Sequence, residues 1–318
     1  MEKLPNLKIA FFGTSDRSLP ILDSLNSNFY LVLVVTKTDR KIGRKQTIKS
    51  TAVKDWTLDK NIPLVELDKF KEGEAEKIVA LFREYDIDYG IVADFSYIVP
   101  KELCAVLYGK LINIHFSLLP KYRGASPVQY AILSGDKSTG VTLQLLNFKI
   151  DSGDILQTIE YPISSKATSG ELYKKLFEIS AEKLPKILAG YYSGDIRSIK
   201  QDPGLISYTY SRSHNKNTFI YKEDAKIDWK NSSVEIERAI RAFNPWPIAW
   251  TTIEDLNSQQ ARSVLIGQGV NKKFIGEGHK IVKIYEADVV EGKLKPITIQ
   301  LEGKTKTDWE SFLNGYYK

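Results

Sequence analysis

The sequence of 318 residues contains a single cysteine, Cys104, and only three histidines, at positions 115, 214 and 279. One cysteine cannot form an intramolecular disulfide, which is consistent with a reducing compartment. These few residues also lack the close spacing of a zinc site, so we expect no bound metal. No run of about 18 apolar residues is present, which argues against a transmembrane helix.

The first apolar stretch, Leu7 to Phe12, also lacks two features that would change its interpretation. It is too short for a signal peptide and no small-residue cleavage site follows it, so we expect a cytoplasmic protein. The turn after it (FGTSDRSLP) has only Gly13 where a dinucleotide-binding fingerprint has three glycines. The sequence therefore gives no support for a nucleotide cofactor at this turn.

The composition is that of a globular chain long enough for two domains. Hydrophobic residues make up 42% and charged residues 26% of the sequence, which leaves ample material for a core. The net charge is +6, which permits a polyanionic partner without requiring one.

Strand-like and helix-like segments alternate through the first third of the chain. Continuous apolar runs typical of buried strands are separated by segments of helical length, and this alternation favours a doubly wound, mostly parallel sheet. The expected strands span residues 7–12, 30–36, 63–66 and 89–93, and the expected helices span 51–60 and 74–85. The run from Ala105 to Ile114 is expected to form a further buried strand, interrupted by one turn.

Three polar residues stand out at the end of that last run. Asn113 and His115 lie two residues apart, so on a strand they share one face. Asp151 opens an acidic turn (DSGD) 36 residues after His115. An amide, an imidazole and a carboxylate at strand ends suit a proton-transfer site. The simpler alternative is that Asn113 and His115 are buried polar residues bonded to backbone, and that Asp151 caps a turn.

The motifs around these residues resemble those of the 10-formyltetrahydrofolate-dependent formyltransferases. The resemblance rests on Asn-x-His followed by SLLP, then RGASP, then DSGD, and it extends over nearly the whole chain. Within that family the chain most resembles the branch that formylates methionyl-initiator tRNA. The resemblance implies a Rossmann-like formyltransferase domain followed by a small barrel domain of the oligonucleotide-binding type.

The resemblance also implies roles for individual residues. Asn113, His115 and Asp151 match the catalytic residues, and 10-formyltetrahydrofolate is the implied co-substrate. The folate pocket would be formed by Phe95, Ile98, Ser117, Leu118, Leu119 and Pro120. On its residues alone, the segment from 94 to 100 is equally compatible with an ordinary connection in the core.

A basic segment lies between Thr36 and Lys49, with six lysines or arginines against one acidic residue. By charge alone it is either a solvated loop or a contact for phosphates. The resemblance favours the second interpretation, because tRNA-formylating members have a basic insertion here that meets the tRNA acceptor end. It assigns tRNA binding to Arg40, Lys41, Arg44 and Lys45.

The C-terminal third begins after a polar stretch rich in Ser, Asn and Tyr. We expect a catalytic domain over residues 1–200, a linker over 201–222 and a C-terminal domain over 223–318. The helix expected at Ser233–Ala242, followed by FNPWP, resembles the start of the family's second domain. Strands are expected at 249–254, 281–289 and 296–301, fewer than a five-stranded barrel needs. This domain is therefore expected to be trimmed.

Several functions remain open at this stage. The first is formylation of methionyl-initiator tRNA in translation initiation, and the alternative is an amino-sugar N-formyltransferase with the same folate donor. The basic segment and the FNPWP domain favour the first. Formyltetrahydrofolate hydrolases and glycinamide ribonucleotide formyltransferases are not expected to have this second domain. A non-catalytic RNA-binding protein would require loss of the residues at 113, 115 or 151, and all three are present.

Overall fold

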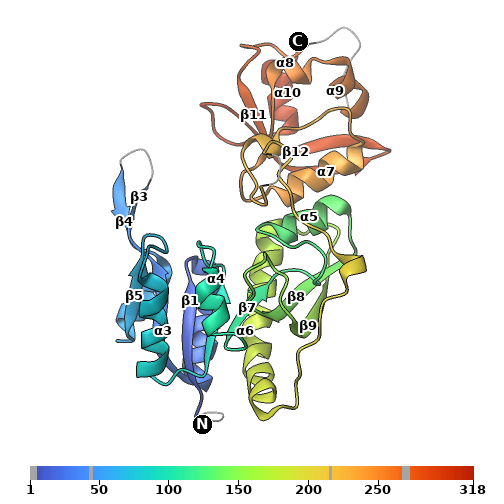
Figure 1. The fold of residues 1–318 in the computed structure, drawn as a ribbon. Coiled ribbons are helices and arrows are strands. Elements are labelled where there is room, and N and C mark those ends of the chain that lie inside the picture. Colours follow the sequence, from blue (N-terminus) through green and yellow to red (C-terminus); the bar gives the residue numbers. More distant parts are fainter. Residues whose placement is uncertain (1–5, 43–45, 215–216, 267–272) are drawn as a thin grey trace. The chain divides into compact units, whose positions relative to one another are not determined.

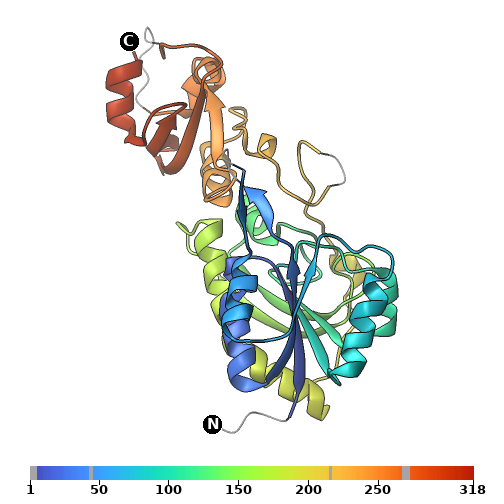
Figure 2. The same ribbon diagram turned by 90° about the vertical axis from the view of Figure 1, so that its left-hand side faces the viewer.

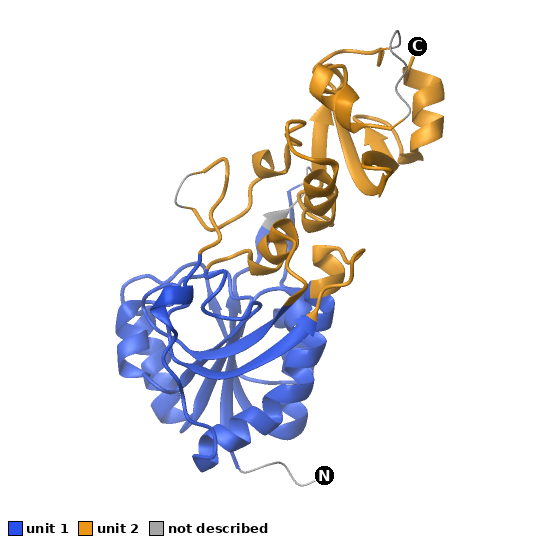
Figure 3. Ribbon diagram, turned by 90° about the vertical axis from the view of Figure 1, so that its right-hand side faces the viewer, with its two compact units in different colours: residues 1–123, 139–161, 173–207 blue, residues 124–138, 162–172, 208–318 orange. Residues whose placement is uncertain are grey.

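A computed structural model describes residues 6–42, 46–214, 217–266 and 273–318 (Figure 1). By the density of contacts the chain divides into two compact units (Figure 3). Unit 1 consists of residues 1–123, 139–161 and 173–207, and unit 2 of residues 124–138, 162–172 and 208–318. The chain thus passes between the units several times.

A seven-stranded sheet forms the centre of unit 1. Its order is β5 (Leu64–Leu67), β2 (Tyr30–Lys37), β1 (Lys8–Gly13), β6 (Tyr89–Ala93), β7 (Leu111–His115), β8 (Ser138–Leu145) and β9 (Ile155–Pro162). The strands from β5 to β7 are parallel, and β8 is antiparallel to β7. The chain builds outward from β1 to β5 and then returns to the other side of β1, so the strand order reverses between β1 and β6. The predicted doubly wound, mostly parallel sheet is confirmed, and this reversal is where such sheets bind ligands.

Helices cover both faces of this sheet (Figure 2). α3 (Glu74–Glu84) and α4 (Lys101–Val106) pack on one face, whereas α1 (Leu19–Asn28), α2 (Ala52–Asp59) and α6 (Ser169–Ser193) lie on the other. The first face carries a cluster of buried side chains. Every second residue of a strand contributes to it, such as Ala10 and Phe12 in β1. This burial on both sides explains why the strands are continuous apolar runs.

One predicted strand was wrong in its first half. The run from Ala105 to Ile114 was expected to be a strand interrupted by one turn. Instead, Ala105 and Val106 are the last residues of helix α4, and β7 begins at Leu111. Leu103, Cys104 and Leu107 are buried on one side of this helical segment. A short apolar run fits a helix or a strand equally well, and here packing determined the outcome.

The described residues of the basic segment include two short paired strands. β3 (Arg40–Ile42) pairs antiparallel with β4 (Thr47–Lys49). Nη2 of Arg40 lies 3.4 Å from Oδ1 of Asp68, and both side chains are about half exposed or more. The predicted tRNA-binding residues Arg44 and Lys45 lie outside the described residues, and Lys41 is in β3.

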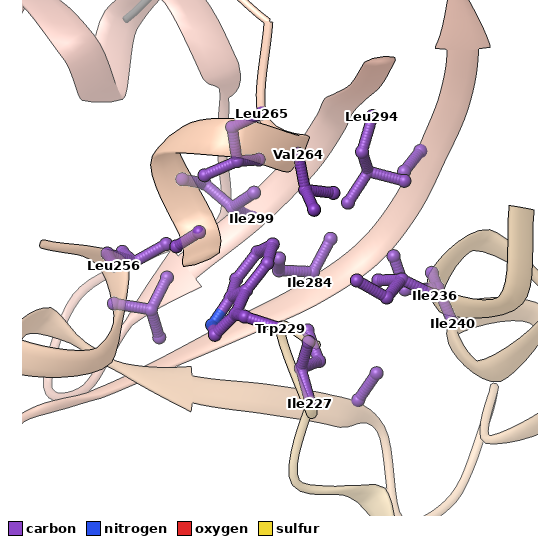
Figure 4. Packing of buried hydrophobic residues seen from close by; sticks show 14 of the residues in the cluster. Ile227, Trp229, Ile236, Ile240, Leu256, Val264, Leu265, Ile284, Leu294 and Ile299 are labelled. Atoms are coloured by element: carbon purple, nitrogen blue, oxygen red, sulfur yellow. The ribbon is translucent and has the colours of Figure 1, made fainter. Parts of the chain in front are cut away.

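Unit 2 has an antiparallel sheet in the order β10 (Ala249–Thr252), β11 (Ile281–Val290), β12 (Lys293–Leu301) and β13 (Thr307–Asp308). Its helices are α5 (Pro127–Ser134), α7 (Ser233–Ala242), α8 (Ile253–Leu256), α9 (Gln259–Val264) and α10 (Trp309–Tyr316). Trp229 lies in the middle of the buried cluster, with Ile284 of β11 next to it and Val264 of α9 on the side toward Leu294 (Figure 4). In the described part of unit 2 this main sheet has four strands, fewer than a five-stranded barrel.

Helix caps explain two of the boundaries. The strand expected to reach Glu254 ends at Thr252, because the Thr252 hydroxyl accepts the N–H of Asp255 and starts α8. At the start of α6, the Glu171 carboxylate accepts from the N–H and hydroxyl of Thr168. With the N–H of Glu171 donating to the Thr168 hydroxyl at 3.3 Å, these bonds form a capping box.

Ser211, Ser213 and Tyr221 all donate hydrogen bonds to one carboxylate, that of Asp224. Burial raises the pKa of Asp224, but hydrogen bonds from the N–H groups of Tyr221 and Ser213 and the hydroxyl of Ser211 outweigh it, so the pKa is lowered. His214 is exposed in this turn and its ring stacks on Tyr221.

Candidate active site

Two side chains of unit 1, Asn113 and His115, approach the same oxygen atom, Oδ1 of Asp151. Nδ2 of Asn113 lies 3.3 Å from this atom and Nδ1 of His115 lies 3.5 Å from it. His115 is only 5% exposed, whereas Asn113 and Asp151 are partly buried. The structure thus brings together the three polar residues that the sequence singled out, at the carboxyl end of β7.

The ring of His115 is oriented by a backbone carbonyl. Its Nε2 lies 3.0 Å from the carbonyl oxygen of Tyr122. A carbonyl can only accept, so Nε2 holds a hydrogen and donates it. Nδ1 is therefore the ring nitrogen that faces Asp151.

Gln144 is a fourth member of the site that sequence reasoning missed. Its Nε2 donates to Asp151 Oδ1 at 3.0 Å, and its Oε1 accepts the N–H of Gly153 at 3.2 Å. β8 pairs with β7 so that Gln144 is opposite Asn113, and opposite residues project from the same face of the sheet. Had the antiparallel pairing of β7 and β8 been foreseen, this register would have identified Gln144.

Gln201 and Arg123 extend the network. Gln201 Nε2 donates to the carbonyl oxygens of Asp151 at 2.9 Å and Gly153 at 2.8 Å. Its Oε1 accepts from Nε and Nη2 of Arg123, at 3.1 and 2.7 Å. Arg123 belongs to the RGASP motif, but nothing in the sequence distinguishes Gln201 from the polar stretch around it.

The turn that holds Asp151 is closely packed against β8. Asp151 has a φ of +46°, in the left-handed region that non-glycine residues rarely adopt. A Cβ atom on Gly153 would lie 1.6 Å from the carbonyl oxygen of Leu145, and the Leu145 N–H donates to the carbonyl of Asp154 at 2.9 Å. Only glycine allows the chain to pass this close to the strand.

The SLLP loop after β7 is fastened to β8 by Thr142. The Thr142 hydroxyl donates to the carbonyl of Ser117 at 2.7 Å and accepts the N–H of Leu119 at 3.1 Å. Ser117 is fully buried, and its own hydroxyl donates to the carbonyl of Lys121. Of the four residues predicted to contact folate here, Leu118 is partly buried, and Ser117, Leu119 and Pro120 are buried.

The other predicted wall of a folate pocket follows β6. Phe95 is partly buried and packs edge-on against Phe12, with ring centroids 5.8 Å apart, whereas Ile98 is 77% exposed. Asp94 has a φ of +49° and accepts from the Ser15 hydroxyl and from Arg17, both at 2.6 Å. Asp94 therefore ties the loop after β6 to the turn after β1, at the reversal of strand order.

Neither a reactive thiol nor a metal group accompanies this site. Cys104 is buried, and burial raises the pKa of its thiol to about 11. Across the described ranges, no cluster of three or more His, Cys, Asp or Glu side chains could hold a metal ion. A search of those same ranges also finds no helix long and apolar enough to cross a membrane.

Comparison with known proteins identifies families that match most of the chain. Residues 7–188 match the formyl transferase family, and residues 219–317 match the formyl transferase C-terminal domain. A methionyl-tRNA formyltransferase of Listeria monocytogenes is 34% identical over 97% of this chain and 95% of its own length.

Two solved structures are similar to the whole chain. A sugar 3N-formyl transferase, determined with dTDP and 5-N-formyl-THF, has a TM-score of 0.60 and 23% identity, covering 94% of this chain and 99% of its own. Methionyl-tRNA formyltransferase from Clostridium thermocellum has a TM-score of 0.57 and 15% identity, covering 93% and 98%. At these identities they support the fold alone.

The fold and these matches define a formyl-transferring enzyme. The chain belongs to the formyl transferase family, and its near full-length relatives include methionyl-tRNA formyltransferases. The family resemblance that the sequence motifs indicated is confirmed.

Proposed function

We propose that this enzyme transfers a formyl group from 10-formyltetrahydrofolate to the amino group of methionyl-initiator tRNA, and so acts in translation initiation in the cytoplasm. The observation that supports this most is the 34% identity to the Listeria enzyme over both chains, including the C-terminal domain. We retain residues 1–200 as the catalytic domain, 201–222 as a linker and 223–318 as the C-terminal domain of this proposal.

The catalytic roles follow from the groups around Asp151 Oδ1. The substrate amine attacks the formyl carbon, and the Asn113 amide donates to the oxyanion that forms. The amine must lose one proton and the folate nitrogen must gain one. The imidazole of His115 can accept and release a proton at Nδ1, which suits it to this transfer, with the Asp151 carboxylate beside it. No covalent nucleophile is needed, because the amine is the nucleophile.

The acceptor is the point on which the alternative differs. An amino-sugar N-formyltransferase would use the same donor and the same three residues. The test offers methionyl-initiator tRNA and a nucleotide-linked amino sugar side by side with 10-formyltetrahydrofolate. We expect formylation of the tRNA alone. Formylation of the sugar alone would retain the site and the donor but contradict the proposed acceptor.

The basic segment is proposed to contact the phosphates of the tRNA acceptor end through Arg40, Lys41, Arg44 and Lys45. Arg44→Ala is expected to weaken tRNA binding and to reduce the slope of log K against log salt by about 1, as for the loss of one phosphate contact. Binding measured at several salt concentrations checks this. Lys183→Ala, which removes an exposed charge from α6, is the control. An unchanged slope in Arg44→Ala would show that Arg44 makes no phosphate contact and that the basic segment is only a solvated surface.

A further inference from the structure

Residues 201 and 207 form hydrogen bonds to two loops of the site. One loop contains Asp151, and the other contains Tyr122, whose carbonyl binds His115. Gln201 binds the loop of Asp151, as described above. Ser207 binds the loop of Tyr122: its hydroxyl accepts the Tyr122 N–H at 2.9 Å and its N–H donates to the Pro120 carbonyl at 3.2 Å. The first residues of the proposed linker are therefore bonded to the site.

We infer that Gln201 is a positioning residue for Asp151, an inference that rests on the catalytic role of Asp151 proposed above. The orientation of its amide is fixed by the partners. The arginine at 123 can only donate, so it binds Oε1, and the two shorter contacts of Nε2 are to carbonyl oxygens, which can only accept. Each hydrogen of the amide thus has an acceptor in the Asp151 turn.

The turn needs such a support because its backbone is unfavourable by itself. Asp151 is in the left-handed region, and a non-glycine residue stays there only when its surroundings hold it. Gln201 holds the carbonyls on both sides of Ser152, whereas Gln144 holds the carboxylate and the N–H of Gly153. Gln201 therefore holds the backbone of the turn and so positions the Cα atom from which the Asp151 side chain extends.

The test uses Gln201→Glu in the full-length enzyme. Glutamate keeps an oxygen that accepts from Arg123 but cannot donate to the two carbonyls. The variant therefore loses the hydrogen bonds to the Asp151 turn and retains the contact with Arg123. We expect kcat to fall about tenfold to a hundredfold, with KM for the tRNA changed less than about threefold and the thermal midpoint maintained by the pair with Arg123. Gln201→Met, of similar length, is the second variant, and Gln157→Met on the exposed side of β9 is the control.

A double-variant comparison separates the inference from the proposed function. In an Asp151→Asn background, Gln201→Glu is expected to cause little further loss, because it acts through the carboxylate. If Asp151→Asn is inactive but Gln201→Glu and Gln201→Met both keep kcat within twofold, the positioning role is wrong and the proposed function stands. Losses that multiply in the double variant would also overturn it. Full activity in Asp151→Asn would overturn both.

Discussion

Replacing His115 with alanine is expected to lower kcat/KM for formyl transfer by about a hundred- to ten-thousand-fold, the range of a general acid–base catalyst. The reason is the geometry of its ring. Nε2 is bonded to the carbonyl of Tyr122, and Nδ1 lies beside the Asp151 carboxylate, to which Asn113 also donates. Without the imidazole, the site loses the ring nitrogen that faces Asp151 and can accept and release a proton. Steady-state kinetics with 10-formyltetrahydrofolate and methionyl-initiator tRNA measure the effect.

Two further variants make this prediction specific. His115→Gln keeps a polar side chain in the buried position and is expected to be as inactive as the alanine variant, so a loss of activity cannot be attributed to an empty space alone. His214→Ala removes an exposed imidazole that stacks on Tyr221 and is expected to keep wild-type rates. Activity of His115→Ala within a few-fold of wild type would show that the site has been assigned incorrectly.

The sequence predicts the parts of the site that follow from a local rule. Asn113 and His115 share a face because side chains on a strand alternate, and β7 has both on one side. The DSGD turn was recognisable as a unit from its own four residues. Each of these inferences uses residues that are close together in the chain.

The parts that sequence reasoning missed depend on contacts between distant segments. Gln144 reaches Asp151 because β8 runs antiparallel to β7, a direction that alternating strands and helices do not predict. Gln201 lies 50 residues after Asp151 in a stretch without any periodic pattern. The end of α4 was missed because a short apolar run does not distinguish helix from strand. In all three, tertiary packing rather than local pattern determines the structure.

Gly153→Ala is expected to have the second large effect, on stability as well as on rate. The added methyl carbon would lie 1.6 Å from the carbonyl oxygen of Leu145, far inside contact distance. This oxygen belongs to the backbone of a buried strand, so it cannot rotate away as a flexible side chain would. The turn must move instead, which we expect to cost about 2 kcal/mol or more.

The same movement displaces the catalytic groups. Gly153 donates its N–H to Gln144 and its carbonyl accepts from Gln201, so a shifted turn takes Asp151 away from His115. A displacement of about 1 Å is enough to lower the rate by about a hundredfold. Thermal unfolding and formyl-transfer kinetics of the same preparation measure both effects.

Gly315→Ala is the matched control for this prediction. A Cβ atom at Gly315 would have no neighbour within 4 Å, and the residue lies exposed in helix α10. Alanine is the better helix former, so this variant is expected to keep full activity and to be slightly more stable, by up to about 1 kcal/mol. If Gly153→Ala behaved like Gly315→Ala, the turn would not be held against β8 as the structure has it, and the support that Asp151 receives from Gln144 and Gln201 would have to be reconsidered.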